Sequence, residues 1–177
     1  MHSIKGKTFV PFIEKQRLEE RIEELGRKIS EDYEGKNPLL VVVLNGAFMF
    51  ASDLMKNISI PCEITFVRVS SYTETKSSGE LTEVLGLKES IRGRHVIIVE
   101  DIVDTGLTMN KLLFQLSIQK PGSIQVASLL FKPEALKTPL NIKYVGFEIE
   151  NKFVVGYGLD YDEQGRNIPE IYVLKES

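Results

Sequence analysis

An apolar, β-branched run that leads into a glycine-containing turn constrains the fold of this chain more than any other feature. Residues 95–99 have the composition of a strand that is buried on both faces of a parallel sheet. The turn 104–108 contains Gly106, and residues 109–119 after it have the pattern of a helix. A helix that begins directly after such a turn presents converging backbone N–H groups and a positive dipole end. The sequence therefore predicts an anion-binding turn at the end of a buried strand.

Three acidic residues are expected in the same turn: Glu100, Asp101 and Asp104. Because carboxylates repel phosphate, an anion-binding turn among acids indicates a ligand with two kinds of group. Its phosphate would meet Thr105, Gly106 and Thr108, while the acids would face hydroxyl groups or a metal ion. A phosphorylated sugar that binds together with Mg²⁺ satisfies both requirements.

Length, charge and cysteine content exclude several classes of protein. The chain has 177 residues and a formal net charge of −3, so we expect a single domain, residues 1–177, without a basic surface for nucleic acid. Cys62 is the single cysteine, which excludes an intrachain disulfide and favours a reducing compartment. The longest apolar run, residues 39–44, is too short to span a membrane, and the N-terminus lacks the apolar core of a signal peptide. We therefore expect a cytoplasmic protein.

Strands and helices alternate along the chain, which predicts an α/β fold with an open, mostly parallel twisted sheet flanked by helices. One helix is predicted from an apolar stripe at helical spacing: Leu18, Ile22, Leu25 and Ile29. A second, short helix is predicted over residues 48–56, and strands over residues 39–44, 62–69, 95–99, 123–131, 153–155 and 171–174. Ligands of such sheets bind beyond the carboxyl ends of the strands. The residues expected at this edge are Asn45, Ser71, Glu100 and Lys132.

Residues 70–85 form a polar segment with almost no apolar side chains. This segment is too long for an ordinary connection in a compact domain, so we interpret it as a mobile functional loop or lid.

Residues 100–108 resemble the phosphoribosyl diphosphate (PRPP) signature of the purine phosphoribosyltransferases, and in particular that of the hypoxanthine-guanine enzymes. Further segments match this family in the same order: residues 44–50 its pyrophosphate loop, 71–72 its lid, 128–132 its purine-reading lysine, and 152–166 its base-stacking and metal-binding segment. The resemblance therefore covers nearly the whole chain. It implies a type I phosphoribosyltransferase fold, with a small hood formed by the terminal segments. It also implies transfer of the 5-phosphoribosyl group from PRPP to hypoxanthine or guanine.

The resemblance assigns a role to each acid of the motif. Asp104 would be the general base that removes the proton from N7 of the purine as N9 bonds to the sugar. Glu100 and Asp101 would lie near the ribose 2′- and 3′-hydroxyls and act partly through water on a Mg²⁺. The 5′-phosphate would be held by Thr105, Gly106, Leu107 and Thr108.

Residues outside the motif would bind pyrophosphate and the purine. The pyrophosphate ligands that the resemblance implies are Leu44, Asn45, Gly46, Ser71, Tyr72 and Arg166. The residues implied for the purine site are Lys132, Phe153, Val154 and Asp160, of which Asp160 would also coordinate a Mg²⁺ bound to pyrophosphate. Lys132 would donate a hydrogen bond to O6, Phe153 would stack on the base, and the backbone of Val154 would meet the edge of the base. Closure of the lid would exclude water from the reaction.

Asn45 departs from the family pattern, because many relatives carry a lysine after the leucine of the pyrophosphate loop. The resemblance also implies a cis peptide bond at this point and assembly into a homodimer or homotetramer. Two alternatives stay open. One is a phosphoribosyltransferase that prefers another 6-oxopurine, such as xanthine. The other is a non-catalytic RNA-binding regulator with the same fold, which would need a clustered basic face that the sequence does not show.

Overall fold

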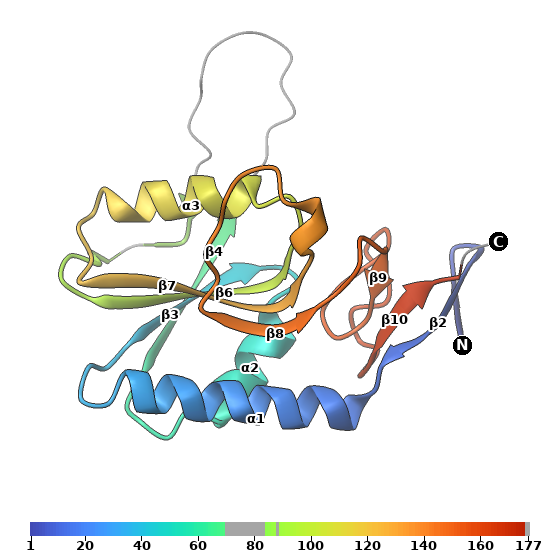
Figure 1. Cartoon of the computed structure of the whole chain (residues 1–177), viewed down its shortest axis with the longest axis horizontal. Coiled ribbons are helices and arrows are strands. Elements are labelled where there is room, and N and C mark those ends of the chain that lie inside the picture. The colour runs from blue at the N-terminus through green and yellow to red at the C-terminus, as the bar shows by residue number, and fades with distance from the viewer. Residues whose placement is uncertain (70–83, 88, 176–177) are drawn as a thin grey trace, which may run out of the picture.

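A mixed β-sheet with helices on both faces forms the body of the molecule in the computed structural model, which describes residues 1–69, 84–87 and 89–175 (Figure 1). Within these residues the strand order is β5-β4-β3-β6-β7-β8. The strands are β3 (Leu39–Leu44), β4 (Glu63–Val69), β5 (Val84–Leu85), β6 (His95–Val103), β7 (Ser123–Phe131) and β8 (Tyr144–Glu148). All neighbours pair in parallel except β4 and β5, which are antiparallel. The predicted open, mostly parallel α/β sheet is confirmed.

Alternating side chains of the central strands are buried on opposite faces of this sheet. On β3, Leu40 and Val42 pack with α1 (Lys15–Asp32) and α2 (Phe48–Lys56). Leu39, Val41 and Val43 face the other way and join the core under α3 (Leu107–Ser117). The predicted helical stripe is buried along α1: Leu18, Ile22, Leu25 and Ile29. Because both faces are covered, a continuous apolar run such as β3 is the expected strand sequence.

Strand β6 is four residues longer than its apolar run predicts. It pairs with β7 from His95 to Val103, so Glu100 and Asp101 belong to the strand and not to the turn that follows. Backbone pairing with β7, which is also nine residues long, continues this strand past its two acidic residues. Helix α3 also begins earlier than expected, at Leu107, because Gly106 has φ +77° and turns the chain directly into the helix.

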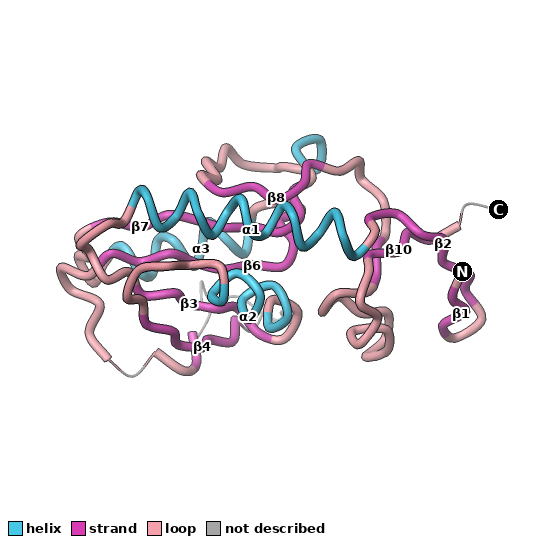
Figure 2. The backbone as a smooth tube through the Cα atoms, turned by 90° about the horizontal axis from the view of Figure 1, so that it is seen from below, coloured by secondary structure: helices cyan, strands magenta, loops and turns pink. Residues whose placement is uncertain are grey.

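The two ends of the chain form a second, smaller antiparallel sheet beside the body. Its order is β1 (His2–Ile4), β2 (Lys7–Ile13), β10 (Ile171–Leu174) and β9 (Val154–Val155). This hood has its own small core: Ile4, Phe9, Val155, Ile168 and Tyr172. Figure 2 shows α1 beginning at the hood, where β2 and β10 lie side by side, and running from there across the sheet. The predicted hood of terminal segments is confirmed.

The predicted lid falls largely outside the described residues, which exclude 70–83. Its last two residues form β5 rather than a loop, and they pair with Arg68 and Val69 at the end of β4. None of the helices in the described part of the chain combines the length and apolar character that crossing a bilayer requires.

Candidate active site

The carboxyl ends of β3, β6 and β7 place most of the predicted functional residues at one edge of the sheet. Asn45 follows β3, Asp104 follows β6 and Lys132 follows β7. Parallel pairing brings these ends together, since Val103 of β6 lies opposite Phe131 of β7 and Val42 of β3 lies opposite Val99 of β6. This is the edge at which open α/β sheets bind ligands.

Three segments far apart in the sequence meet at Gly46. The peptide bond between Leu44 and Asn45 is cis, as the resemblance implied. A Cβ atom on Gly46 would lie 1.5 Å from Oδ2 of Asp101, and one on Gly158 would lie 2.1 Å from the carbonyl oxygen of Gly46. Glycine is therefore required at both positions by direct contact. The loop after β3, the acids of β6 and the turn after β9 thus form one site.

Glu100 and Asp101 are adjacent, partly buried carboxyls. Burial and the neighbouring Asp101 carboxylate raise the pKa of Glu100 well above its ordinary value. Burial also raises the pKa of Asp101, although hydrogen bonds and the positive charge of Arg166 oppose that effect. Oδ1 of Asp101 accepts a hydrogen bond of 2.8 Å from the N–H of Ile102. A bound cation would favour the ionised form of both groups, so the pair fits an oxygen-liganded metal such as Mg²⁺.

The turn after β6 has the geometry of an anion site. Gly106 precedes the first turn of α3, so the N-terminal N–H groups of that helix face the rim. The carbonyl oxygen of Thr105 accepts a hydrogen bond of 3.0 Å from the N–H of Lys137, which anchors the turn to the segment after β7. Leu107 and Thr108 are exposed at the helix start. The four predicted phosphate ligands, residues 105–108, thus lie in the turn before α3 and at the start of that helix.

Asp104 and Lys132 form an ion pair of 3.1 Å between Oδ2 and Nζ. The side chain of Lys132 is only 8% exposed, whereas that of Asp104 is 48% exposed. Lys132 is therefore not a surface lysine, even though it precedes Pro133 and the short 3₁₀ helix η1 (Pro133–Ala135). Its ammonium group also donates to Oδ1 of Asn151 at 3.5 Å. The pair can therefore bind a ligand with two adjacent polar groups: a hydrogen-bond acceptor that faces Lys132 and a donor that faces Asp104.

Phe153 lies half-exposed directly before β9, which begins one residue later than predicted, and 47% of its surface is accessible. Its ring contacts Tyr161 edge-on at 5.7 Å and lies 6.4 Å from Phe9, so the hood holds it from two sides. From its sequence alone Phe153 would be an ordinary core residue, but the structure leaves part of the ring open. Val154 is buried and pairs with Val173.

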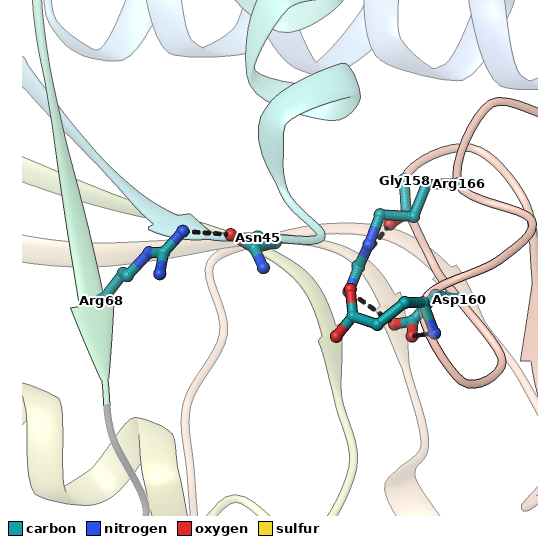
Figure 3. Close-up of polar contacts among 6 residues, drawn as sticks. Asn45, Arg68, Gly158, Asp160 and Arg166 are labelled. Carbon is teal, nitrogen blue, oxygen red and sulfur yellow. Dashed lines mark hydrogen bonds and ion pairs between the residues drawn. The ribbon is translucent and has the colours of Figure 1, made fainter.

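Asp160 and Arg166 are paired with each other in the turn after β9 (Figure 3). Nη2 of Arg166 lies 2.8 Å from Oδ1 of Asp160, and Nη1 donates to the carbonyl oxygen of Gly158 at 2.9 Å. Oδ2 of Asp160 accepts a hydrogen bond from the N–H of Glu163 at 2.8 Å. Both predicted residues thus lie beside the Gly46 loop, and each already has a partner of opposite charge.

Two predicted ligands, Ser71 and Tyr72, lie outside the described residues. Within the described part of the chain, no group of three or more acidic, histidine or cysteine side chains is arranged to hold a metal. One residue that the sequence analysis did not single out is Arg68, whose Nη2 donates to Oδ1 of Asn45 at 3.0 Å. The available signal was an arginine near the carboxyl end of an apolar strand.

Comparisons with known proteins agree with this geometry. The model of the phosphoribosyl transferase domain family matches residues 13–162. The hypoxanthine-guanine-xanthine phosphoribosyltransferase of Tritrichomonas foetus is 45% identical over 161 residues, covering 90% of this chain and 88% of the relative. The hypoxanthine-guanine phosphoribosyltransferase of Dictyostelium discoideum is 45% identical over 172 residues, covering 94% of this chain and 95% of the relative.

A solved structure gives the same result in three dimensions. The hypoxanthine-guanine phosphoribosyltransferase of Bacillus anthracis, with a HEPES molecule in its active site, superposes with a TM-score of 0.84 at 36% sequence identity. The match covers 96% of this chain and 99% of that one. Sequence, fold and site geometry lead to the same conclusion: the chain belongs to the type I phosphoribosyltransferases, in the hypoxanthine-guanine phosphoribosyltransferase family of purine salvage.

Proposed function

We propose that this chain joins hypoxanthine or guanine to PRPP through the residues gathered at the sheet edge, giving IMP or GMP and pyrophosphate. The observation that carries this assignment is the Asp104–Lys132 pair, in which a donor and an acceptor lie 3.1 Å apart. O6 and N7 share one edge of a 6-oxopurine, with an acceptor at O6 and a donor at N7–H. The side-by-side pair is complementary to that edge.

Lys132 would donate its hydrogen bond to O6, and Asp104 would take the proton from N7 as N9 bonds to the sugar carbon. In this structure Lys132 and Asp104 bind each other. When the purine binds, Lys132 would contact O6 and Asp104 would contact N7–H. Adenine has a 6-amino group that cannot accept from Lys132. The N–H of Lys132 that faces the base would then have no acceptor in a buried position, and this cost would disfavour adenine. The open part of the Phe153 ring would stack on the base, beside the backbone of Val154.

The phosphoribosyl group would occupy the turn and the acids before it. Thr105, Gly106, Leu107 and Thr108 would bind the 5′-phosphate through hydroxyl and backbone N–H groups at the start of α3. Glu100 and Asp101 would lie next to the ribose hydroxyls. The pyrophosphate would contact the loop 44–46, Arg166 and, in the part of the chain not described, Ser71 and Tyr72.

We also propose that Mg²⁺ is the cofactor, held by Asp160 and by Glu100 and Asp101, partly through water. Mg²⁺ is commonly bound by one or two carboxylates together with substrate phosphates, which fits these acids better than an all-protein cage would. When bound, the ion would neutralise charge on the phosphate oxygens. The acids on this chain would position it and, once ionised, would orient the ribose.

Two further expectations belong to the proposal. We propose a homodimer or homotetramer, supported by Phe48 and Phe66, large apolar side chains that are exposed next to each other around a groove between α2 and β4. We also propose that the protein acts in the cytoplasm, supported by its single cysteine, Cys62.

Measuring nucleotide formation from four bases, each with PRPP and Mg²⁺, tests the function. We expect product from hypoxanthine and guanine, and a kcat/KM for adenine lower by at least about 10²-fold because Lys132 loses its acceptor. Xanthine is included because a 45% identical relative is named for it as well. Higher efficiency with xanthine than with either other 6-oxopurine would support the alternative substrate preference. Absence of product from every base would contradict the proposal and leave the RNA-binding alternative.

A further inference from the structure

Arg68 places a guanidinium group beside the loop that follows β3. It is the second-last residue of β4, where it lies opposite Leu44 in the parallel ladder. Its Nη2 donates to Oδ1 of Asn45 at 3.0 Å, so the side chain reaches across to the residue after the cis peptide bond. Figure 3 shows Arg68 directed at Asn45, on the side of Asn45 away from the Arg166–Asp160 pair.

The charge of Arg68 is not offset by an acid among the described residues. Other arginines of this structure contact carboxylates: Arg166 pairs with Asp160 and Glu163, and Arg94 pairs with Glu63. Arg68 instead contacts the neutral amide of Asn45, and no described carboxylate lies within ion-pair distance of it. A positive group at a ligand-binding edge, without an acid to neutralise it, is suited to an anion.

This contact also determines which atoms Asn45 presents to a ligand. An arginine can only donate hydrogen bonds, so it requires the amide oxygen of Asn45 to face it. The amide NH₂ group, with its two donors, must then point away from Arg68. Both side chains are exposed, so the pair offers N–H donors to the solvent side of the loop. The orientation follows from the chemistry of the guanidinium group.

We infer that Arg68 and Asn45 together bind the pyrophosphate group, with Arg68 supplying the positive charge and Asn45 supplying oriented donors. This inference rests on the proposed function and extends it to a residue on β4. The loop after β3 carries no cation of its own, because Asn45 is neutral and glycine and alanine follow it. Arg166 lies on the other side of the loop, and its charge is shared with Asp160. Arg68 therefore provides the positive charge that the loop itself lacks.

The test uses pyrophosphorolysis of IMP, because the KM for pyrophosphate can then be measured separately from that of the nucleotide. In Arg68→Gln we expect the KM for pyrophosphate to rise about ten- to a hundredfold, the size expected for losing a charge-assisted hydrogen bond. The KM for IMP should stay unchanged. The KM for pyrophosphate of Arg68→Lys should lie between those of wild type and Arg68→Gln, because lysine keeps the charge but lacks the planar guanidinium group. Arg92→Gln is the matched control, since Arg92 is exposed at the opposite edge of the sheet, before β6.

A second variant separates a charge effect from a local structural defect. Adding Asn45→Lys to the Arg68→Gln background places a cation on the loop itself, and we expect it to restore most of the affinity for pyrophosphate. An unchanged KM for pyrophosphate in Arg68→Gln, or no recovery in the double variant, would overturn the inference. Failure of the proposed function would be distinct, because the unsubstituted protein would then form no nucleotide from PRPP and any base.

Discussion

At the scale of single residues, the main electrostatic feature of the site is the unfavourable free energy of ionising two adjacent buried carboxyls, Glu100 and Asp101. Their raised pKa values have the same first cause, burial, and Glu100 is raised further by its charged neighbour. A group whose pKa is raised in the folded state stabilises the fold at low pH, where it is protonated in both states. This stabilisation is lost as the pH rises through the folded-state pKa.

Glu100→Gln should remove this pH dependence. Below the ordinary pKa of glutamate, 4.5, wild type and variant should differ little in the free energy of unfolding. As the pH rises toward neutrality, wild type should lose stability relative to the variant, because burial and the neighbouring Asp101 carboxylate make ionised Glu100 unfavourable in the folded state. Urea denaturation of both proteins without substrate, at several pH values, measures the difference. Two curves that stay parallel over this range would show that Glu100 ionises without cost in the folded state.

The positions of individual residues were predictable to different degrees. Lys132 was identified because it follows an apolar strand, and Asp104 because it belongs to the acidic turn motif; their contact joins residues 28 positions apart. The half-exposed state of Phe153 was not predictable from an apolar run, because only its packing against Tyr161 and Phe9 leaves part of the ring open. Arg68 was missed for a similar reason, since its contact with Asn45 depends on the pairing of β4 with β3.

At the scale of elements, the sequence pattern predicted the limits of those helices and strands that depend mainly on their own residues. The limits of β3, α2 and β7 agree with their apolar runs and flanking polar residues. The end of β6 was wrong by four residues, because pairing with β7 extends a strand past Glu100 and Asp101. Strands β1, β2 and β8 were not predicted as elements, since short strands gain their stability from partners elsewhere in the chain, as β2 does from β10.

The close contact between the turn after β9 and the loop after β3 makes Gly158 a sensitive position. In Gly158→Ala, the new Cβ would lie 2.1 Å from the carbonyl oxygen of Gly46 at a φ of +98°. We expect a loss of about 1–3 kcal/mol in the free energy of unfolding, from the unfavourable backbone conformation and the displaced loop. The KM for PRPP should rise as well.

Gly35→Ala is the control for this prediction, because Gly35 has φ +71° but nothing within 4 Å of an added Cβ. Gly35→Ala should lower the free energy of unfolding, because alanine disfavours a positive φ, without changing the KM for PRPP. Thermal denaturation and steady-state kinetics of both variants measure the two effects. An equal KM for PRPP in the two variants would mean that the contact between the turn and the loop does not support the site.

At the scale of the whole molecule, the hood and the sheet each provide one side of the site. The sheet edge supplies Asp104 and Lys132, and the hood supplies Phe153 and Asp160. Phe9, from the N-terminal strand β2, is completely buried, and its ring lies near both Phe153 and Tyr161. The position of the stacking ring therefore depends on the pairing of the two ends of the chain.

Phe9→Ala should affect stability and purine binding together. Removing a fully buried phenyl group is expected to cost about 3–5 kcal/mol, and the Phe153 ring would lose a neighbour, which should raise the KM for hypoxanthine. Leu116→Ala, a buried truncation near the end of α3 and away from the hood, should destabilise without that increase. Kinetics at a temperature where both variants are folded distinguish them. A similar KM for hypoxanthine in both would argue against a role of the hood in placing Phe153.

The turnover number of Asp104→Asn with hypoxanthine and PRPP tests most directly whether this edge of the sheet carries out the chemistry. The substitution keeps the size of a side chain that is about half exposed and removes its ability to accept a proton. We predict a loss of roughly 10²- to 10⁴-fold in kcat, the usual contribution of one general base, with PRPP binding largely retained. Turnover close to that of wild type in the folded variant would contradict the assignment of Asp104 as the base.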